Sequence, residues 1–233
     1  MKKRFDIVTL FPDVCDAYVR ASILGRAQKG RIIDIRSHDL RTYSADKKHR
    51  RVDDKPFGGG PGMVMQVGPF DRALKRIRSK AQKAKTRVIV TSASGKLFTQ
   101  KDAKRLLKYD QLIFLSGRYE GIDHRVEQEL ADEALRVGDY VLTGGELPAL
   151  IMTDAIARLV PGVLGSEASL STESHSTDGF LEHPQYTRPE MYETVIKGKK
   201  RKLKVPPVLL SGNHKEILKW QEEHQSPTSS LPM

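Results

Sequence analysis

Residues 112–121 read LIFLSGRYEG, an apolar run that ends in a loop with two glycines. Short apolar runs bounded by turn residues predict strands. Runs of the same kind recur along the chain at residues 5–10, 32–35, 88–91, 112–115 and 134–137. Helix-like patterns fill several of the gaps between them, so the sequence predicts an α/β fold in which helices cover a parallel sheet.

The first predicted helix begins near Pro12 and Asp13, which suit a first helical turn, and ends at Gly30. The residues predicted to face the core from it are Val14, Ala17, Leu24 and Ala27. Further helices are predicted over residues 69–84, 99–107, 123–131 and 146–159.

The balance of charge is strongly basic. The 233 residues include 40 Lys and Arg against 29 Asp and Glu, a net charge of +11. A field of this sign attracts a polyanion, and nucleic acid is the partner that it favours. An acidic membrane surface is the competing partner, but the basic residues are scattered through apparently folded segments and form no single amphipathic anchor.

Cys15 is the only cysteine, which excludes an internal disulfide and a cysteine-rich metal site and fits a reducing compartment. The apolar run at the N-terminus is broken by Asp6 and is too short for a signal peptide. No 18 consecutive residues are apolar, so no membrane span is predicted. We expect a cytoplasmic protein.

Composition divides the chain into three parts. Residues 1–163 carry the predicted sheet, and residues 164–187 are rich in Ser and Thr, as in a linker or functional loop. Residues 188–233 contain the basic run KGKKRKLK (197–204) and an amphipathic pattern around Trp220. We expect this last part to be a small, mainly helical domain.

Three glycine-bearing segments follow predicted strands: SASG (92–95), SGRYEG (116–121) and GDYVLTGGELPA (138–149). Ligands bind beyond the carboxyl ends of parallel strands, so all three are expected at one ligand-binding edge, although each alone could be a tight turn. Neither G-x-G-x-x-G nor G-x-x-x-x-G-K-[ST] occurs, which argues against the usual NAD and nucleoside triphosphate sites.

The stretch PFGGGPGM (56–63) closes a long basic loop and opens no helix, which argues against a phosphate cradle at a helix N-terminus. One interpretation is a flexible, solvated loop. The other is a backbone that lies close against a flat partner, because glycines permit such an approach.

Six blocks of the sequence occur together: VDDKPFGGGPGMVM (52–65), SGRYEGIDHRV (116–126), VGDYVLTGGELPAL (137–150), RLVPGVLG (158–165), EHPQYTRPE (182–190) and VPPVLLSGNH (205–214). In this order they resemble the bacterial tRNA (guanine-N1)-methyltransferases of the TrmD type, from residue 4 to about residue 220. The resemblance implies a SPOUT-type fold, in which the parallel sheet ends in a deep trefoil knot that binds S-adenosylmethionine.

The resemblance also implies site residues. Those implied for the cofactor are Ser92, Gly95, Gly117, Tyr119, Glu120, Val137, Gly138, Asp139, Tyr140, Val141, Leu142, Gly144, Gly145 and Pro148. Backbone groups would read adenine and ribose, while Glu120 would attract the positive amino or sulfonium group. No metal is needed to hold the cofactor, but the resemblance leaves magnesium open as a second cofactor in catalysis.

The implied reaction is methylation of N1 of the guanosine immediately 3′ of the anticodon (position 37). N1 of neutral guanine carries a proton, so a general base is required. The family aspartate for this step corresponds to Glu173 here, a departure from the commonest pattern, and Asp178 competes for the role. Arg158 corresponds to the arginine that stabilises negative charge on O6. Structural or solvated roles are the alternatives for all three.

The remaining implications concern partners. The resemblance implies a homodimer with its active site between the subunits. It also implies that the glycine loop of residues 56–63 forms a flat wall against the extruded guanine. Residues implied in tRNA binding are His49, Arg50, Arg51, Asp53, Gly58, Gly59, Gly60, Met63 and Arg188. The run KGKKRKLK departs from the family as a basic insertion, and we expect its Lys199, Lys200, Arg201 and Lys202 to bind tRNA as well, because lysines bind phosphates without a precise fold. The alternatives are a SPOUT methyltransferase with another RNA target and a catalytically silent RNA-binding protein.

Overall fold

The computed structural model describes residues 2–78, 84–165, 173–177 and 180–227. The chain forms two compact units, Met1–Glu167 and Ala168–Met233.

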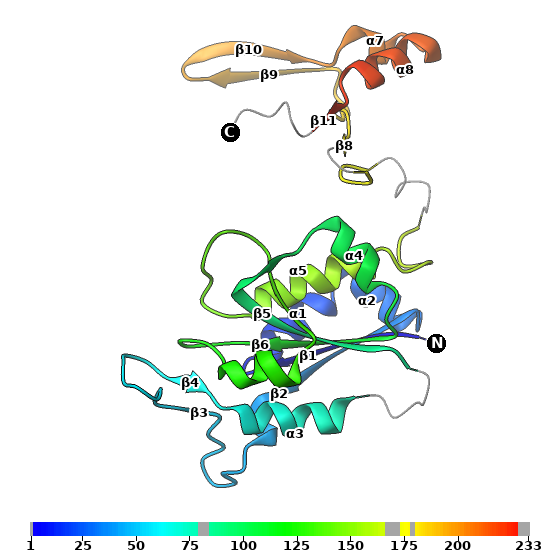
Figure 1. Cartoon of the computed structure of the whole chain (residues 1–233). Coiled ribbons are helices and arrows are strands. Elements are labelled where there is room, and N and C mark those ends of the chain that lie inside the picture. Colours follow the sequence, from blue (N-terminus) through cyan, green and yellow to red (C-terminus); the bar gives the residue numbers. More distant parts are fainter. Residues whose placement is uncertain (1, 79–83, 166–172, 178–179, 228–233) are drawn as a thin grey trace. The chain divides into compact units, whose positions relative to one another are not determined.

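The first unit is built on a five-stranded parallel sheet with the order β2-β1-β6-β5-β7 (Figure 1). Its strands are β1 (Lys3–Thr9), β2 (Ile33–Asp39), β5 (Thr86–Leu97), β6 (Gln111–Ser116) and β7 (Glu133–Arg136). All six residues of β6 are buried, as expected for a central strand covered on both faces. The predicted α/β class and the five strands of the parallel sheet are confirmed.

Helices cover both faces of this sheet (Figure 1). They are α1 (Pro12–Val19), α2 (Ser22–Lys29), α3 (Val67–Ile77), α4 (Gln100–Leu106) and α5 (Glu146–Ala157), with a 3₁₀ turn over Leu40–Tyr43 and a π-helical turn over Val126–Leu130. One apolar cluster packs α1, α2, α4 and α5 around Phe5 and Phe114. The other packs α3 against Val8 and Ile113 on the opposite face.

The predicted first helix is in fact two helices, because the chain turns at Ser22, whose φ is 47°. Leu24 and Ala27 of α2 are buried as predicted, but the prediction for Val14 and Ala17 was wrong. Both are exposed, and α1 instead turns Cys15 and Val19 to the core. The sequence pattern was misread because α1 has apolar residues on its outer face as well.

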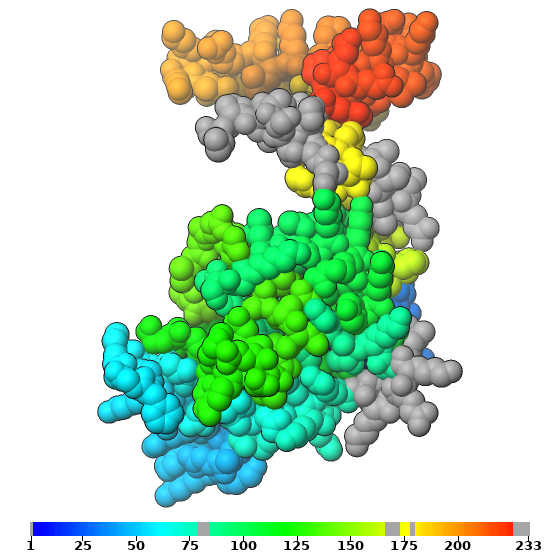
Figure 2. All heavy atoms as spheres, viewed as in Figure 1, coloured from blue at the N-terminus to red at the C-terminus, as the bar shows by residue number. Residues whose placement is uncertain are grey.

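Other boundaries also differ from the sequence pattern. The helix predicted over 69–84 is α3, which ends at Ile77, and residues 79–83 of that prediction lie outside the described residues. The short strands β3 (Asp53–Asp54) and β4 (Val64–Met65) flank the glycine loop. This segment, coloured cyan, projects from the body of the first unit (Figure 2), and the side chain of Phe57 at its start is fully exposed.

The second unit mixes strands and helices. Its elements are β8 (Phe180–Leu181), β9 (Met191–Ile196), β10 (Lys199–Lys204), α7 (Pro207–Leu210), α8 (His214–Glu223) and β11 (Ser226–Pro227). The prediction of a mainly helical domain was wrong, because the basic run forms β10 of an antiparallel hairpin. The turn at Lys197 and Gly198 has φ values of 49° and 73°, as in the two-residue turns that favour hairpins.

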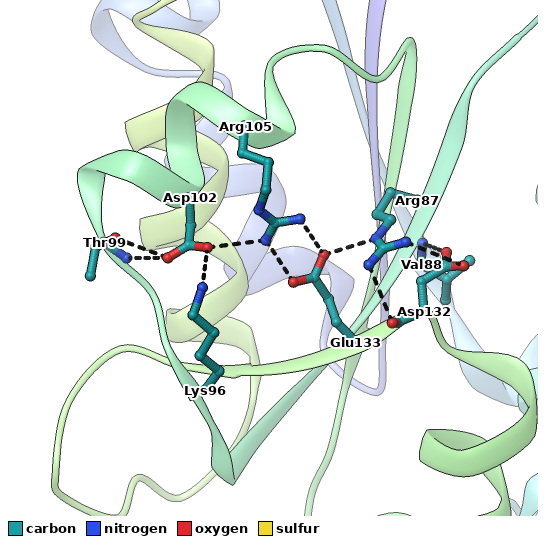
Figure 3. A network of polar contacts seen from close by, with 8 residues as sticks. All are labelled: Arg87, Val88, Lys96, Thr99, Asp102, Arg105, Asp132 and Glu133. Carbon is teal, nitrogen blue, oxygen red and sulfur yellow. Dashed lines mark hydrogen bonds and ion pairs between the residues drawn. The ribbon is translucent and has the colours of Figure 1, made fainter.

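A polar network joins α4 to the first residues of β5 and β7 (Figure 3). Arg105 forms ion pairs with Asp102 at 3.1 Å and with Glu133 at 2.7 Å, and Arg87 donates to Glu133 at 2.9 Å. Burial raises the pKa of Asp102, but hydrogen bonds from Lys96, Thr99 and Arg105 outweigh it and leave the pKa below its usual value. The network therefore stabilises the fold with Asp102 ionised.

We expect Asp102→Asn to lower the free energy of unfolding by about 2 kcal/mol at neutral pH, because Asp102 is almost fully buried and also caps α4 through Thr99. Since the folded state lowers the pKa of Asp102, its contribution is present above the usual pKa of 3.8 and is lost as the pH falls through the lowered value. Urea titrations at neutral and acid pH should show a difference that shrinks on acidification. Asp71→Asn, which removes an exposed pair with Lys75, is the control and should cost less than about 0.5 kcal/mol.

Candidate functional site

A cavity of about 430 Å³ lies at the carboxyl edge of β5, β6 and β7. Residues 90–94 line it from β5, residues 117–122 from the segment after β6, and residues 135–138 and 140–145 from the end of β7 and the segment after it. The three glycine-bearing segments thus meet at one edge, as the sheet argument expected. SASG is not a loop, however: it is an irregularity inside β5, which pairs with β7 on both sides of it.

Two glycines let these segments cross at very short range. The amide of Gly145 donates to the carbonyl of Gly117 at 2.8 Å. A Cβ atom on Gly145 would lie 2.0 Å from Oγ1 of Thr91 and 2.8 Å from the amide nitrogen of Gly117. Residue 145 is therefore glycine because of space: its φ of −85° would suit any residue. Gly117, Gly144 and Gly145 at this crossing line the cavity, and residues without side chains let a ligand come close to the backbone.

A buried carboxylate binds Arg118, one of the residues that line the cavity. Glu146, only 1% exposed, accepts hydrogen bonds from Thr9 Oγ1 at 2.7 Å and from Arg118 Nε at 2.9 Å. The guanidinium of Arg118 also donates to the carbonyl of Thr143 at 3.2 Å and lies 4.5 Å from the ring centre of Phe11. Arg118 thereby links the segment after β6, to which it belongs, to the segment after β7.

The glycine loop of residues 56–63 lies against the same cavity. Its four glycines, Gly58, Gly59, Gly60 and Gly62, all have positive φ values, a conformation that glycine adopts without strain. The amide of Glu120 donates to the carbonyl of Met63 at 3.1 Å, and a Cβ on Gly62 would lie 2.5 Å from the side chain of Glu120. The loop is thus in close contact with Glu120, a residue that lines the cavity.

A model of the family described as tRNA (Guanine-1)-methyltransferase TrmD matches residues 3–230. The chain belongs to the TrmD family. The resemblance inferred from the six sequence blocks is therefore confirmed.

Curated relatives agree with the family match. A tRNA (guanine-N(1)-)-methyltransferase of Ruminiclostridium cellulolyticum is 50% identical over 218 residues, which cover 94% of this chain and 89% of the relative. Proteins of the same name from Geobacter sulfurreducens and Mycoplasmopsis agalactiae are 46% and 47% identical, each over 220 residues and 94% of this chain, covering 85% and 90% of the relatives.

The cavity brings together most of the residues that the TrmD resemblance implied for the cofactor. Those that line it are Ser92, Gly117, Tyr119, Glu120, Val137, Gly138, Tyr140, Val141, Leu142, Gly144, Gly145 and Pro148. Gly95 and Asp139 do not line it. A Cβ on Gly95 would lie 2.6 Å from the backbone of Ala134, and Asp139, 82% exposed, pairs with Arg136 at 2.8 Å.

Sequence reasoning missed several lining residues of this TrmD-family chain, among them Arg118, His124, Glu127, Arg136 and Thr143. Arg118 lies inside the SGRYEG block, where an arginine between glycines was a usable signal. Nothing in the sequence indicated that Arg136 and Thr143 would face the cavity.

The three residues implied in catalysis lie apart from one another in the chain. Arg158 is the first residue after α5, whose N-terminal end borders the cavity. Twelve helical residues span about 18 Å, so Arg158 is at the far end of α5 from the cavity. Glu173 belongs to the second unit, and Asp178 lies outside the described residues.

His49, Arg50 and Arg51 of the basic loop are all exposed, and Arg50 also pairs with Asp39 at 3.0 Å. Asp53 pairs with Met65 between β3 and β4. In the second unit, Arg188 and the four residues 199–202 are exposed.

Within the described ranges, no three His, Cys, Asp or Glu side chains are grouped so that they could hold a metal ion. The same residues include no helix with the length and apolar character needed to cross a membrane.

Proposed function

We propose that this chain methylates N1 of the guanosine immediately 3′ of the anticodon in tRNA, with S-adenosylmethionine as the methyl donor. The observation that carries this proposal is the convergence of three glycine-bearing segments around one cavity in a member of the TrmD family. The cavity volume of about 430 Å³ lies in the range of small-molecule sites, and the glycine-bearing segments that line it suit the donor.

Most of the implied cofactor residues line this cavity, and we assign them to the donor. Amides and carbonyls of the segments after β6 and β7 would bind adenine and ribose. Glu120 would attract the positive charge of the donor, and Tyr119, Tyr140 and Val141 supply exposed apolar surface. When bound, S-adenosylmethionine supplies a methyl group on a positively charged sulfur.

The chain's own residues must deprotonate N1 and stabilise O6. We propose that Glu173 accepts the proton from N1, with Asp178 as the competing base. Arg158 would stabilise the negative charge on O6. An arginine that stabilises such a charge contributes roughly 3 kcal/mol. Magnesium is a proposed second cofactor in catalysis.

A homodimer would bring Arg158 to a cavity. Arg158 is about 18 Å from the end of α5 that borders the cavity of the same subunit. In a homodimer it would therefore act at the cavity of the partner subunit. An apolar stripe supports this assembly. It is formed by Phe11, Val14 and Tyr18 of α1 and its N-cap together with Leu147 and Ile151 of α5, each 42–54% exposed. The hydroxyl of Tyr18 donates to Asp154 and fixes the two helices side by side.

We also propose that the segments around Gly117 and Gly145 form the trefoil knot of SPOUT proteins, because their backbones cross at hydrogen-bond distance. Residues 1–163 would then be the knotted catalytic domain, residues 164–187 the linker with the catalytic acid, and residues 188–233 the tRNA-binding domain. The cytoplasm, where tRNA is modified, would be its location.

The test is to incubate the protein with methyl-labelled S-adenosylmethionine and two tRNA transcripts that differ only in the nucleotide 3′ of the anticodon, guanosine or adenosine. We expect label in the guanosine transcript alone, mapped to N1. Label in both transcripts would place the target elsewhere in the tRNA. Binding of tRNA without any transfer would instead indicate a silent RNA-binding protein.

A further inference from the structure

Strands β9 and β10 form an antiparallel hairpin (Figure 1). Its two faces are exposed and differ in chemistry. Directly paired residues of an antiparallel hairpin share a face, and successive residues alternate between faces. One face, which we call the Tyr192 face, consists of Tyr192, Thr194, Ile196, Lys199, Arg201 and Leu203. The other, the Glu193 face, consists of Met191, Glu193, Val195, Lys200, Lys202 and Lys204.

Both faces have a net charge of +2, but only one suits a polyanion. On the Glu193 face, Glu193 pairs with Lys202 at 2.8 Å, which places a carboxylate in the middle of the three lysines. The Tyr192 face contains no acidic residue, and within the part of the chain that the structure describes its Lys199 and Arg201 form no ion pair.

The Tyr192 face also offers a stacking surface. Tyr192 is 57% exposed, on the same face as Arg201 and paired across the strands with Leu203. Exposed aromatic rings stack on unpaired bases whatever the sequence, and arginine and lysine bind the backbone beside them. Lys199 and Arg201 are two residues apart on β10, a separation of about 7 Å, which is comparable with the distance between successive phosphates of an extended RNA strand.

We propose that the Tyr192 face of the hairpin is an RNA-binding surface, with Lys199 and Arg201 on successive phosphates and Tyr192 stacked on a base of the tRNA. This inference rests on the proposed function and adds to it, because it divides the five basic residues of β10 into two that bind RNA and three that do not. The lysines of the Glu193 face then act mainly to keep the exposed hairpin from pairing with other copies, a common role of charges on exposed strands.

The test compares two double variants of the full chain. Lys199→Gln with Arg201→Gln removes two charges from the Tyr192 face, and Lys200→Gln with Lys204→Gln removes two from the Glu193 face. All four side chains are exposed, so neither pair should unfold the chain. The equilibrium dissociation constant for an unmodified tRNA transcript is measured at several salt concentrations.

We expect the first pair to raise the dissociation constant about tenfold at low salt and to reduce the slope of log K against log salt by about 2. The second pair should change the slope by less than about 0.5, since it alters only the overall field. Tyr192→Leu should weaken binding about tenfold without changing the slope, because stacking releases no counterions.

Equal effects of the two pairs, in a parent protein that binds and methylates tRNA, would overturn the face assignment and leave the proposed function intact. A parent that neither binds nor methylates tRNA would overturn the proposed function and this inference with it. Binding of S-adenosylmethionine by each variant serves as the control for folding of the first unit.

Discussion

Gly145→Ala is expected to weaken S-adenosylmethionine binding by about a hundredfold and to lower the free energy of unfolding by about 3 kcal/mol. The added methyl group would lie 2.0 Å from Thr91 Oγ1 and 2.8 Å from both the amide nitrogen of Gly117 and Cα of Ser116. Two of these three neighbours are backbone atoms of the segment at the end of β6, so no rotamer change can relieve the overlap. The segments must separate, and the hydrogen bond from Gly145 to Gly117 is lost.

Gly165→Ala is the matched control. Apart from its chain neighbours, no described atom lies within 4 Å of the place that its added methyl group would take, and its φ is not in the left-handed region. Gly165→Ala should leave the affinity for S-adenosylmethionine and the free energy of unfolding within experimental error of the parent. Calorimetry with S-adenosylmethionine and urea titration measure the two effects. Near-parental affinity in Gly145→Ala would show that the crossing is not part of the cofactor site.

The sheet was predictable from the sequence because its strands are buried on both faces and therefore read as uninterrupted apolar runs, as in β6. The assumption that apolar residues face the core failed for α1. Its exposed face carries Phe11, Val14 and Tyr18, and a pattern of apolar residues cannot tell a face that packs against the core from one that stays exposed.

The hairpin was missed for a different reason. Lysine and arginine have no preference for strands, so KGKKRKLK was interpreted only as a basic insertion. Its strand β10 depends on the partner strand β9, rich in β-branched and aromatic residues, and on the turn at Lys197 and Gly198. Pairing of this kind is a property of two segments, and a reading of one segment does not reveal it.

The candidate site was predictable to the level of segments. The rule that ligands bind beyond the carboxyl ends of parallel strands selected all three glycine-bearing segments. It could not select Arg118, whose contacts to Glu146 and Thr143 join residues 25 or more positions apart. Nor could it reveal that Gly62 packs on Glu120, because that contact links the glycine loop to a segment nearly 60 residues later.

The position of Arg158 leads to the second large effect. We expect Arg158→Ala to lower kcat by about a hundredfold to a thousandfold while the affinity for S-adenosylmethionine stays unchanged, since the residue is at the far end of α5 from the cavity. A second variant, Val141→Arg, should block the cavity itself. Val141 lines the cavity yet is 85% exposed, so the larger side chain should not disturb the core.

Mixing these two inactive variants distinguishes a shared site from a separate one. In a heterodimer purified through two different affinity tags, the open cavity of the Arg158→Ala subunit would meet the intact Arg158 of the Val141→Arg subunit. One of the two sites would be complete, and about half of the parental activity should return. If Arg158 served the cavity of its own subunit, both sites of the heterodimer would be defective and no activity would return. Recovered activity therefore requires that Arg158 acts across the subunit boundary. A heterodimer without activity would exclude that role.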